Sequence, residues 1–350
     1  MEIGMSNSGG DFHIELATVS DLPEILELVS SEYGPPYNGK VYWNWRYFDN
    51  PVAKVLIYVA RAANGKIAAM QAVSGYSIHM NGKIHSAHML TGAMTSPHFR
   101  RRGLFRSLVQ RIIQDLSNQG ALMLYTFPNN LSVRGFRRFP GWKENESLSL
   151  YVRPLFGITG RGRHVDDRAE RTNLGTSSLK LEIVSGQEFH VGGDELLNNS
   201  NPALSFIDRS EQYLSWRYGP GSRNEYKMLH AYCNGDYVGY VVWKAIEFKG
   251  MNVGLILDIV ARDNVVASEL LRATVTDSKK QGIRMLAFLV GPTNPNAKAL
   301  VQNGFVKWPN VLFPKHFYLF TYAFHQDTDH SIGTASDANW YLTWGDTDVA

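Results

Sequence analysis

A short basic turn in the first third of the chain consists of residue types that bind phosphate groups: Arg100, Arg101, Arg102 and Gly103. The largely apolar segment 88–95 precedes this turn and predicts a buried strand. Apolar residues in segment 104–116 recur at gaps of one, three and four, which predicts a helix with one buried stripe that ends near Gly120. The N–H groups of a helix N-terminus, the arginine charges and a glycine that admits close approach together predict a pyrophosphate site.

An arginine run before a helix is also typical of a solvated surface. Arginines at a helix N-terminus oppose the helix dipole unless an anion is bound there. Their placement therefore favours a ligand over simple solvation.

The order of residues resembles motif A of the GNAT N-acetyltransferase superfamily, Val-x-Pro-x-x-Arg/Gln-x-x-Gly-x-Gly/Ala, which carries the pyrophosphate of acetyl-CoA. Thr95, Pro97, Arg100 and Gly103 fall on motif positions, with Thr95 in place of Val. Phe105 stands where the motif has Gly or Ala, which changes the packing of the turn and leaves its glycine in place. The resemblance implies acetyl-CoA as a co-substrate.

The same resemblance implies a set of cofactor-binding residues along the strand, the turn and the segment after the next strand. Backbone groups of the strand end would meet pantetheine and the reacting carbonyl, and an asparagine after the next strand would contact pantetheine. A phenylalanine lies at or near the place of the family's tyrosine, which protonates the departing thiolate, so the acid stays open. The implied set is Met94, Thr95, Ser96, Arg100, Arg101, Arg102, Gly103, Leu104, Phe105, Asn129, Asn130 and Phe136.

The general base is less clearly marked, because no glutamate occupies the central strand. His88 lies in that strand, and the aromatic, acidic tail 340–348 ends with Asp346 and Asp348. This ending resembles that of bacterial tandem GNAT-like proteins. The tail is interpreted either as a strand that patches the core or as two carboxylates that grip or deprotonate an amine. The catalytic candidates are therefore Asp346, Asp348 and His88.

The second half of the chain repeats the order of the first. Tyr-Trp-Asn-Trp-Arg-Tyr at 42–47 has its counterpart at 213–218, and both copies are predicted to anchor a helix on its sheet. At the second basic turn, Arg262 is followed by Asp263 in place of the arginine triplet and glycine. An aspartate would repel a phosphate, so only the first copy is expected to bind acyl-CoA.

The predicted fold is α/β, with two tandem GNAT-like units, each a mixed, mostly antiparallel sheet flanked by helices. The expected divisions are a flexible leader at 1–11, an N-terminal acyl-CoA-binding domain at 12–156, a linker at 157–178, a degenerate C-terminal domain at 179–325 and a tail at 326–350 that docks on the cleft or core.

Composition excludes several classes of partner. The net charge of +3 is too small to favour nucleic acid, and no apolar run is long enough to span a bilayer. The single Cys233 cannot form an internal disulfide, which fits a cytoplasmic location, and no Cys/His spacing indicates a metal. The sequence leaves the oligomeric state open.

The expected activity is acetyl-CoA-dependent N-acyl transfer to a small polar amine, by direct transfer in a ternary complex. Basic residues after the Asn129 loop suit an amino sugar or a nucleotide-linked amino sugar: Arg134, Arg137, Arg138 and Lys143. Aminoacyl or longer-chain acyl transfer is one alternative, and a non-catalytic acyl-CoA sensor is another.

Overall fold

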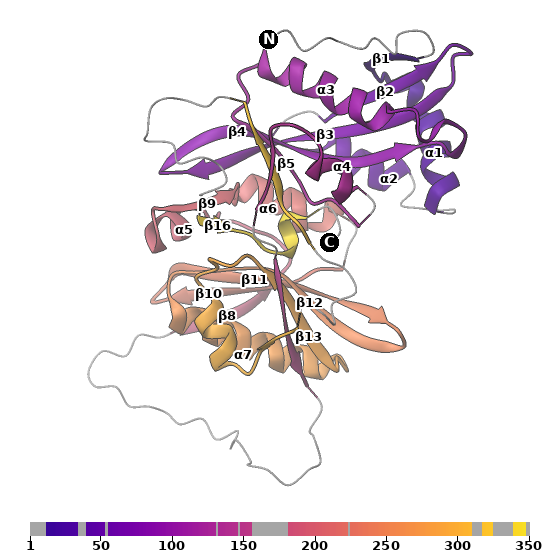
Figure 1. Cartoon of the computed structure of the whole chain (residues 1–350). Helices are drawn as coiled ribbons and strands as arrows, with labels where there is room; N and C mark the ends of the chain where they lie inside the picture. The colour runs from indigo at the N-terminus through magenta and orange to yellow at the C-terminus, as the bar shows by residue number, and fades with distance from the viewer. Residues whose placement is uncertain are drawn as a thin grey trace.

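The computed structural model describes residues 12–33, 40–52, 55–130, 132–145, 148–155, 181–222, 225–309, 317–324 and 339–347. Its strands form one sheet of nine strands and one of seven, which lie one above the other with helices α5 and α6 between them (Figure 1). This arrangement confirms the predicted α/β class with two mixed, mostly antiparallel sheets. The predicted leader and linker lie outside the described residues.

The first half of the chain builds most of the nine-stranded sheet. Its strands are β1 (Phe12–Leu16), β2 (Leu56–Ala62), β3 (Ile67–Met80), β4 (Lys83–Thr95), β5 (Met123–Thr126) and β6 (Trp142–Glu144). Its helices are α1 (Leu22–Tyr33), α2 (Lys40–Trp43), the π-helical turn η2 (Asn44–Phe48), α3 (Leu104–Ser117) and α4 (Val133–Arg137). Strands β1 to β4 pair antiparallel, and β4 pairs parallel with β5. Asn81 and Gly82 both have left-handed backbones (φ 52° and 71°), as the tight hairpin turn between β3 and β4 requires.

The second half supplies the corresponding elements of the seven-stranded sheet. Its strands are β8 (Leu181–Gly186), β10 (Lys227–Cys233), β11 (Asp236–Phe248), β12 (Met251–Ala261), β13 (Met285–Val290) and β14 (Val306–Lys307). Its helices are α5 (Asp194–Ser200), α6 (Glu211–Tyr218), α7 (Asn264–Lys280) and α8 (Ala297–Gln302). Strand β9 (Leu204–Ile207) pairs instead with β3 of the first sheet. No helix among the described residues is long and apolar enough to span a bilayer.

Two strands are exchanged between the sheets. Strand β7 (Ser149–Pro154) lies between β13 and β14, and β15 (Phe320–Ala323) lies between β5 and β6. Each of these strands thus lies between two strands of the opposite half's sheet. The predicted ranges 12–156 and 179–325 therefore do not each contain a complete sheet, because the first sheet takes β9 and β15 from the second range and the second sheet takes β7 from the first.

The described part of the tail lies between the sheets. Strand β16 (Asn339–Tyr341) pairs in parallel with β9, and Trp340, Tyr341 and Leu342 are buried in a core shared by both halves. This burial accounts for the aromatic composition of a segment so near the chain end, because each ring is removed from water.

The repeated aromatic segments join the two halves. The rings of Trp45 and Trp216, equivalent residues of the repeat, stack with centroids 5.5 Å apart. Their role is thus wider than the anchoring of a helix on its own sheet, which was the interpretation from sequence.

Candidate active site

Strands β4 and β5 diverge near the middle of the first sheet. They pair only over Ala87–Met89 and Met123–Tyr125, whereas β4 continues to Thr95. At the point of divergence the Thr126 hydroxyl donates to the Leu90 carbonyl over 3.1 Å. Beyond this bond the edge of β4 has no β5 partner, and we refer to the divergence as the split.

The predicted phosphate-binding turn follows β4 directly. A short 3-10 turn (Pro97–Phe99) leads through Arg100–Gly103 into α3. Gly103 caps α3 with φ 76°, and a Cβ placed there would meet no atom within 4 Å. The first-turn amides of α3 have no preceding carbonyls to bond, so they face this open space as donors. The geometry is that of an anion-binding helix N-terminus.

The arginines of the turn are all exposed, and neighbours orient two of them. Arg100 Nε donates to the Thr95 carbonyl over 3.3 Å, and the Arg102 guanidinium lies 5.8 Å from the ring centres of Phe12 and Phe99. The amide of Ser96, another predicted cofactor contact, donates to Ala68 within the sheet. Met94 and Thr95 pair with β3, so only their other edge is open to the split.

Residues 13–144, which contain the split and the turn, match the family model described as an acetyltransferase (GNAT) domain. The first unit is a GNAT domain. The match agrees with the resemblance to GNAT N-acetyltransferases and covers residues 13–144 of the 350.

Solved structures of similar fold extend over both halves. A conserved protein of unknown function from Enterococcus faecalis, described as a probable N-acyltransferase, is 11% identical with a TM-score of 0.64, over 90% of this chain and 72% of that one. A GCN5-related N-acetyltransferase from Anabaena variabilis is 13% identical with a TM-score of 0.64, over 90% and 73%. N-myristoyltransferase from Saccharomyces cerevisiae with bound myristoyl-CoA is 10% identical with a TM-score of 0.56, over 89% and 82%. No curated protein matches the chain.

Phe105, the departure from the GNAT motif, has a packing partner of its own. Its ring meets Phe136 of α4 edge to face, with centroids 5.3 Å apart. Gly135 makes room for this contact, since a Cβ there would lie 3.4 Å from Phe105. Phe136 itself is 3% exposed and packs against Trp142. The predicted cofactor role of Phe136 is corrected accordingly: the side chain belongs to the core under α4.

Asn129 and Asn130 lie where β5 ends, beside the split. The Asn129 side chain accepts from the Ser132 amide over 3.0 Å, and its carbonyl accepts from the Val133 amide over 2.9 Å. Asn129 therefore fixes the start of α4, while Asn130 is exposed. Both remain predicted pantetheine contacts.

The GNAT domain also contains buried hydroxyls without hydrogen-bond partners among the described residues. Ser74, Met89 and Tyr125 form one cross-strand row, and the hydroxyls of Ser74 and Tyr125 both lack a partner, as does that of Thr91. Buried hydroxyls are normally bonded, so this row is unusual next to a reaction site. Sequence reasoning missed Tyr125, because a tyrosine in a short apolar strand has no distinguishing signal.

Burial raises the pKa of Tyr125 well above its ordinary value, and the nearby Tyr76 and Tyr213 add to the effect. The phenol therefore stays protonated and can donate a hydrogen bond. Such a group suits an oxyanion or a departing thiolate.

His88 precedes Met89 in β4, so its side chain is on the opposite face of the sheet from the row of hydroxyls. It is half-buried, and its Nδ1 is buried without a partner among the described residues. Burial lowers the pKa of His88, which keeps the imidazole neutral near pH 7 and able to accept a proton.

Asp346 does not reach a cleft. It is buried, and the Arg209 Nη2 donates to its Oδ2 over 2.8 Å while Arg209 Nε donates to Asp258 Oδ2 over 2.8 Å. The Thr343 amide also donates to Asp346 over 2.8 Å. The predicted role of Asp346 in gripping an amine is thus corrected to that of a buried ion-pair partner. Asp348 lies outside the described residues.

In the second unit, the helix N-terminus at the corresponding turn is not open to a phosphate. Asp263 caps α7, and its Oδ1 accepts from the amides of Val265 and Val266 over 2.9 and 3.0 Å. The side chain already occupies the place of an anion. The divergence of β12 and β13 is lined by the tail, because the Gly291 amide donates to the Leu342 carbonyl and Val290 bridges to Thr343.

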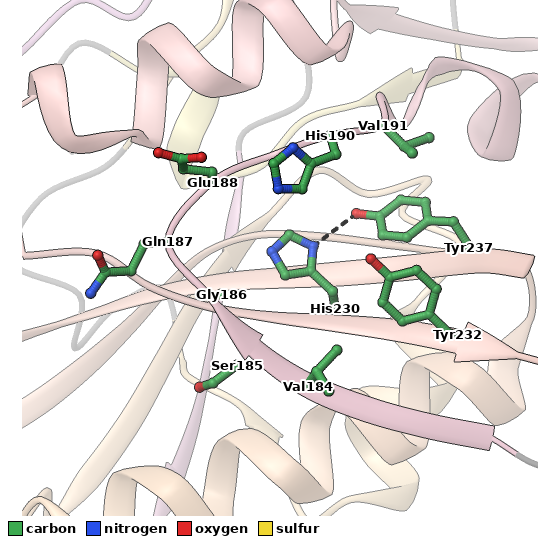
Figure 2. A pocket seen from close by; sticks show the side chains of 10 residues that line it. All are labelled: Val184, Ser185, Gly186, Gln187, Glu188, His190, Val191, His230, Tyr232 and Tyr237. Atoms are coloured by element: carbon green, nitrogen blue, oxygen red, sulfur yellow. Dashed lines mark hydrogen bonds between the residues drawn. The ribbon is translucent and has the colours of Figure 1, made fainter. Parts of the chain in front are cut away.

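A pocket of about 390 Å³ lies elsewhere in the second unit, against β8 and β10 (Figure 2). His230 and Tyr237 line it and are joined through Nδ1 and the phenol oxygen, 3.2 Å apart. Its lining includes no lysine or arginine, so it does not suit the phosphates of a coenzyme.

Proposed function

We propose that the GNAT domain binds acetyl-CoA and that the chain transfers the acetyl group directly to a small polar amine within a ternary complex. The observation that carries this proposal is the contrast between the two units. The open N-terminus of α3 at Gly103 can receive an anion, whereas Asp263 fills the corresponding position of α7. A buried Cys233 fits the cytoplasmic location that accompanies the proposal.

Direct transfer requires three kinds of group around the thioester. A base deprotonates the ammonium, a donor stabilises the oxyanion, and an acid meets the departing thiolate. We assign the donor role toward the thiolate to the Tyr125 hydroxyl, which takes the place of the family tyrosine replaced by Phe136. From the opposite face of the sheet, across the split, we assign the base role to His88. Asp348 stays an alternative for binding the amine.

The acceptor is proposed to carry a phosphate or carboxylate, as a nucleotide-linked amino sugar does. Arg134 and Arg138 are exposed on α4 and its end. Arg137 is committed elsewhere, since its Nε and Nη2 donate to Glu144 over 2.7 and 2.8 Å. Arg134→Ala with Arg138→Ala should therefore raise the KM for the acceptor far more than that for acetyl-CoA, with Arg137→Ala as the matched control. A rise confined to the acetyl-CoA KM would reassign the two arginines to the cofactor.

A longer acyl chain is the second candidate, because the similar fold of N-myristoyltransferase holds myristoyl-CoA. The proposal is tested by thiol release from acyl-CoA donors of increasing chain length against a panel of polar amines. Acetyl-CoA is expected to give the highest kcat/KM. A maximum at a long chain would select the second candidate, and binding without thiol release from any donor would contradict transfer.

Two variants test the assigned groups. Tyr125→Phe should lower kcat with little change in the KM for acetyl-CoA. His88→Gln should remove the acid limb of the kcat/KM profile, which is expected below pH 6.5 because the pKa of His88 is lowered. An unchanged profile in His88→Gln would assign the base to another group.

A further inference from the structure

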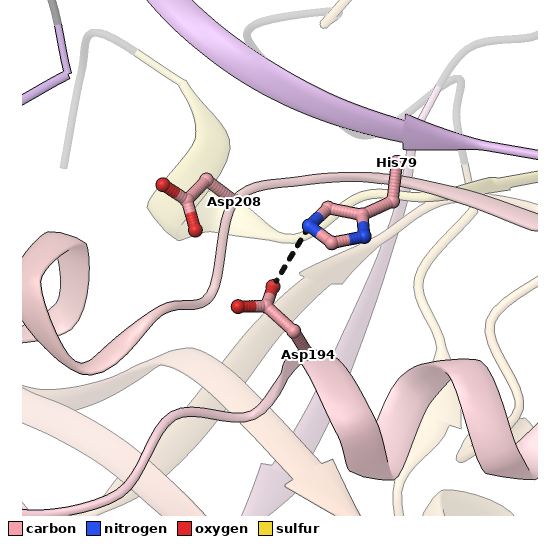
Figure 3. Close-up of side chains that lie close together, drawn as sticks. All are labelled: His79, Asp194 and Asp208. Atoms are coloured by element: carbon pink, nitrogen blue, oxygen red, sulfur yellow. Dashed lines mark ion pairs between the residues drawn. The ribbon is translucent and has the colours of Figure 1, made fainter. Parts of the chain in front are cut away.

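Three side chains that can ligate a metal ion meet where the first sheet contacts the second half of the chain: His79, Asp194 and Asp208 (Figure 3). One ligand atom from each lies within 4.8 Å of the other two. His79 is near the end of β3, Asp194 begins α5, and Asp208 follows β9. No local spacing predicts this group, because the fold brings its members together from distant segments.

The His79 imidazole is held in place by a stacked ring and by a carboxylate partner. It is 9% exposed and stacks on Phe206, with centroids 4.5 Å apart and planes 9° apart. Its Nε2 points at Asp194 Oδ1 over 3.4 Å (Figure 3). A ring nitrogen that faces two carboxylates is placed as a metal ligand would be.

The charge balance around the cluster also favours a cation. Arg209, the nearest buried guanidinium, is already paired with Asp258 and Asp346. Asp194 and Asp208 add two carboxylates to a region where two already share one cation.

Both carboxylates keep ligating capacity. Asp194 Oδ1 accepts from the Arg209 amide and Asp208 Oδ1 accepts from the Ser210 amide, each over 2.7 Å. A carboxylate oxygen has two lone pairs, so one backbone bond leaves room for a metal. The same amides hold the carboxylates in fixed positions, as outer-shell partners of a metal site do.

We propose that His79, Asp194 and Asp208 bind a divalent transition-metal ion, for which Zn²⁺ is the best fit. Two ligands of a tetrahedral zinc ion with bonds of about 2.05 Å lie about 3.3 Å apart, close to the Nε2–Oδ1 separation of 3.4 Å. Imidazole selects such an ion over Mg²⁺ or Ca²⁺. Water would complete the coordination.

The bound ion is a clamp between the two halves. It would join β3 to α5 and to the turn between β9 and α6. His79 pairs with Ile84, ten residues along β3 from the Ala69–Thr95 pair beside the split, which is about 33 Å at the rise of a strand. The ion therefore takes no part in acyl transfer.

The test titrates Zn²⁺ into the chelator-stripped full chain in competition with a chromogenic chelator. One equivalent should bind, and His79→Gln or Asp208→Asn should weaken binding by more than the roughly 10–100-fold that loss of an outer-shell partner causes. His85→Gln, which removes a histidine from neighbouring β4, should leave it unchanged. Equal affinity in His79→Gln, or no saturable binding to the wild type, would overturn the proposal.

Thermal unfolding separates the clamp from a simple His79–Asp194 ion pair. Zn²⁺ should raise the midpoint of the wild type and of His85→Gln, but not of His79→Gln, and Mg²⁺ should raise none. If His79→Gln lowers the unfolding midpoint, and Zn²⁺ shifts the midpoint of neither the wild type nor the variant, then His79 and Asp194 form only an ion pair. That result would refute the metal site.

Discussion

The indole N–H of Trp45 donates to the carbonyl of Trp216 over 2.8 Å, and the indole of Trp216 returns the bond to the carbonyl of Trp45 over 3.0 Å. Equivalent residues of the two repeats thus bond reciprocally, as across the two-fold axis of a symmetric dimer. Arg217 lies against the same junction, with its guanidinium 5.9 Å from the Trp45 ring centre. The repeat is conserved in both copies because each half is the other's partner.

Replacing these indoles should show coupling. Trp45→Phe and Trp216→Phe each remove one donor and should each lower the free energy of unfolding by about 0.5–1.5 kcal/mol. Because the rings stack and the bonds are reciprocal, the double variant should deviate from the sum of the two. Urea denaturation of all four proteins measures this, and strict additivity would mean that the two indoles act independently.

Gly103 should be essential for acyl-CoA binding. Gly103→Glu places a carboxylate in the open space at the N-terminus of α3, where the pyrophosphate is proposed to lie. Gly120→Glu is a matched control, because Gly120 has φ 71° and equally empty surroundings after the same helix ends. Calorimetry should show one acetyl-CoA per chain in the wild type and in Gly120→Glu, and none in Gly103→Glu. Equal binding to both variants would place the pyrophosphate elsewhere.

Asp263 should matter for stability and not for cofactor stoichiometry. Asp263→Ala removes the cap of α7 and should cost about 0.5–2 kcal/mol in the free energy of unfolding. No second acetyl-CoA should bind, because the tail still lines the divergence of β12 and β13. A second calorimetric site in this variant would show that the cap alone excludes the cofactor.

Asp346 should behave as a structural residue. Asp346→Ala leaves Arg209 buried with Asp258 alone and should destabilise the fold by about 3–5 kcal/mol. Asp346→Asn keeps the shape and the Thr343 bond and should cost less. Unfolding curves decide between this role and catalysis: a variant of normal stability that has lost kcat would restore Asp346 as a catalytic group.

The first unit should not survive alone. A chain cut near Gly162 lacks β15, so β5 and β6 lose the strand between them and expose their edges. We expect aggregation and loss of acyl transfer, measured by size-exclusion chromatography and thiol release. A soluble, monomeric and fully active fragment would show that the exchanged strand is dispensable.

The sequence predicted those features of the fold that depend on residues close together along the chain. The turn at Arg100–Gly103 and the apolar stripe of α3 follow from residue spacing and backbone preference, and the structure has both at the predicted positions. Asp263 was expected to repel phosphate, and the structure adds that its carboxylate caps α7.

Features that depend on a distant partner were not predictable in this way. From sequence, Asp346 is interpreted as an exposed acid. In the fold it is paired with Arg209, which lies 137 residues away along the chain. Strand β7 has the composition of a closing strand for the first unit, and nothing in it indicates that its partners are β13 and β14. The His79 cluster likewise has no local signal, because its ligands come from three separate elements.

The exchanged strand β15 also sets the order of events during synthesis. Asn145, just after β6, bonds to Thr321 of β15, 176 residues further along the chain. A nascent chain can carry the whole turn at Arg100–Gly103 outside the ribosome and still hold an unfinished first sheet, because β15 is translated only after the strands of the second sheet. Assembly of the first unit is thereby tied to synthesis of the second, and a product terminated before β15 cannot form a complete first sheet.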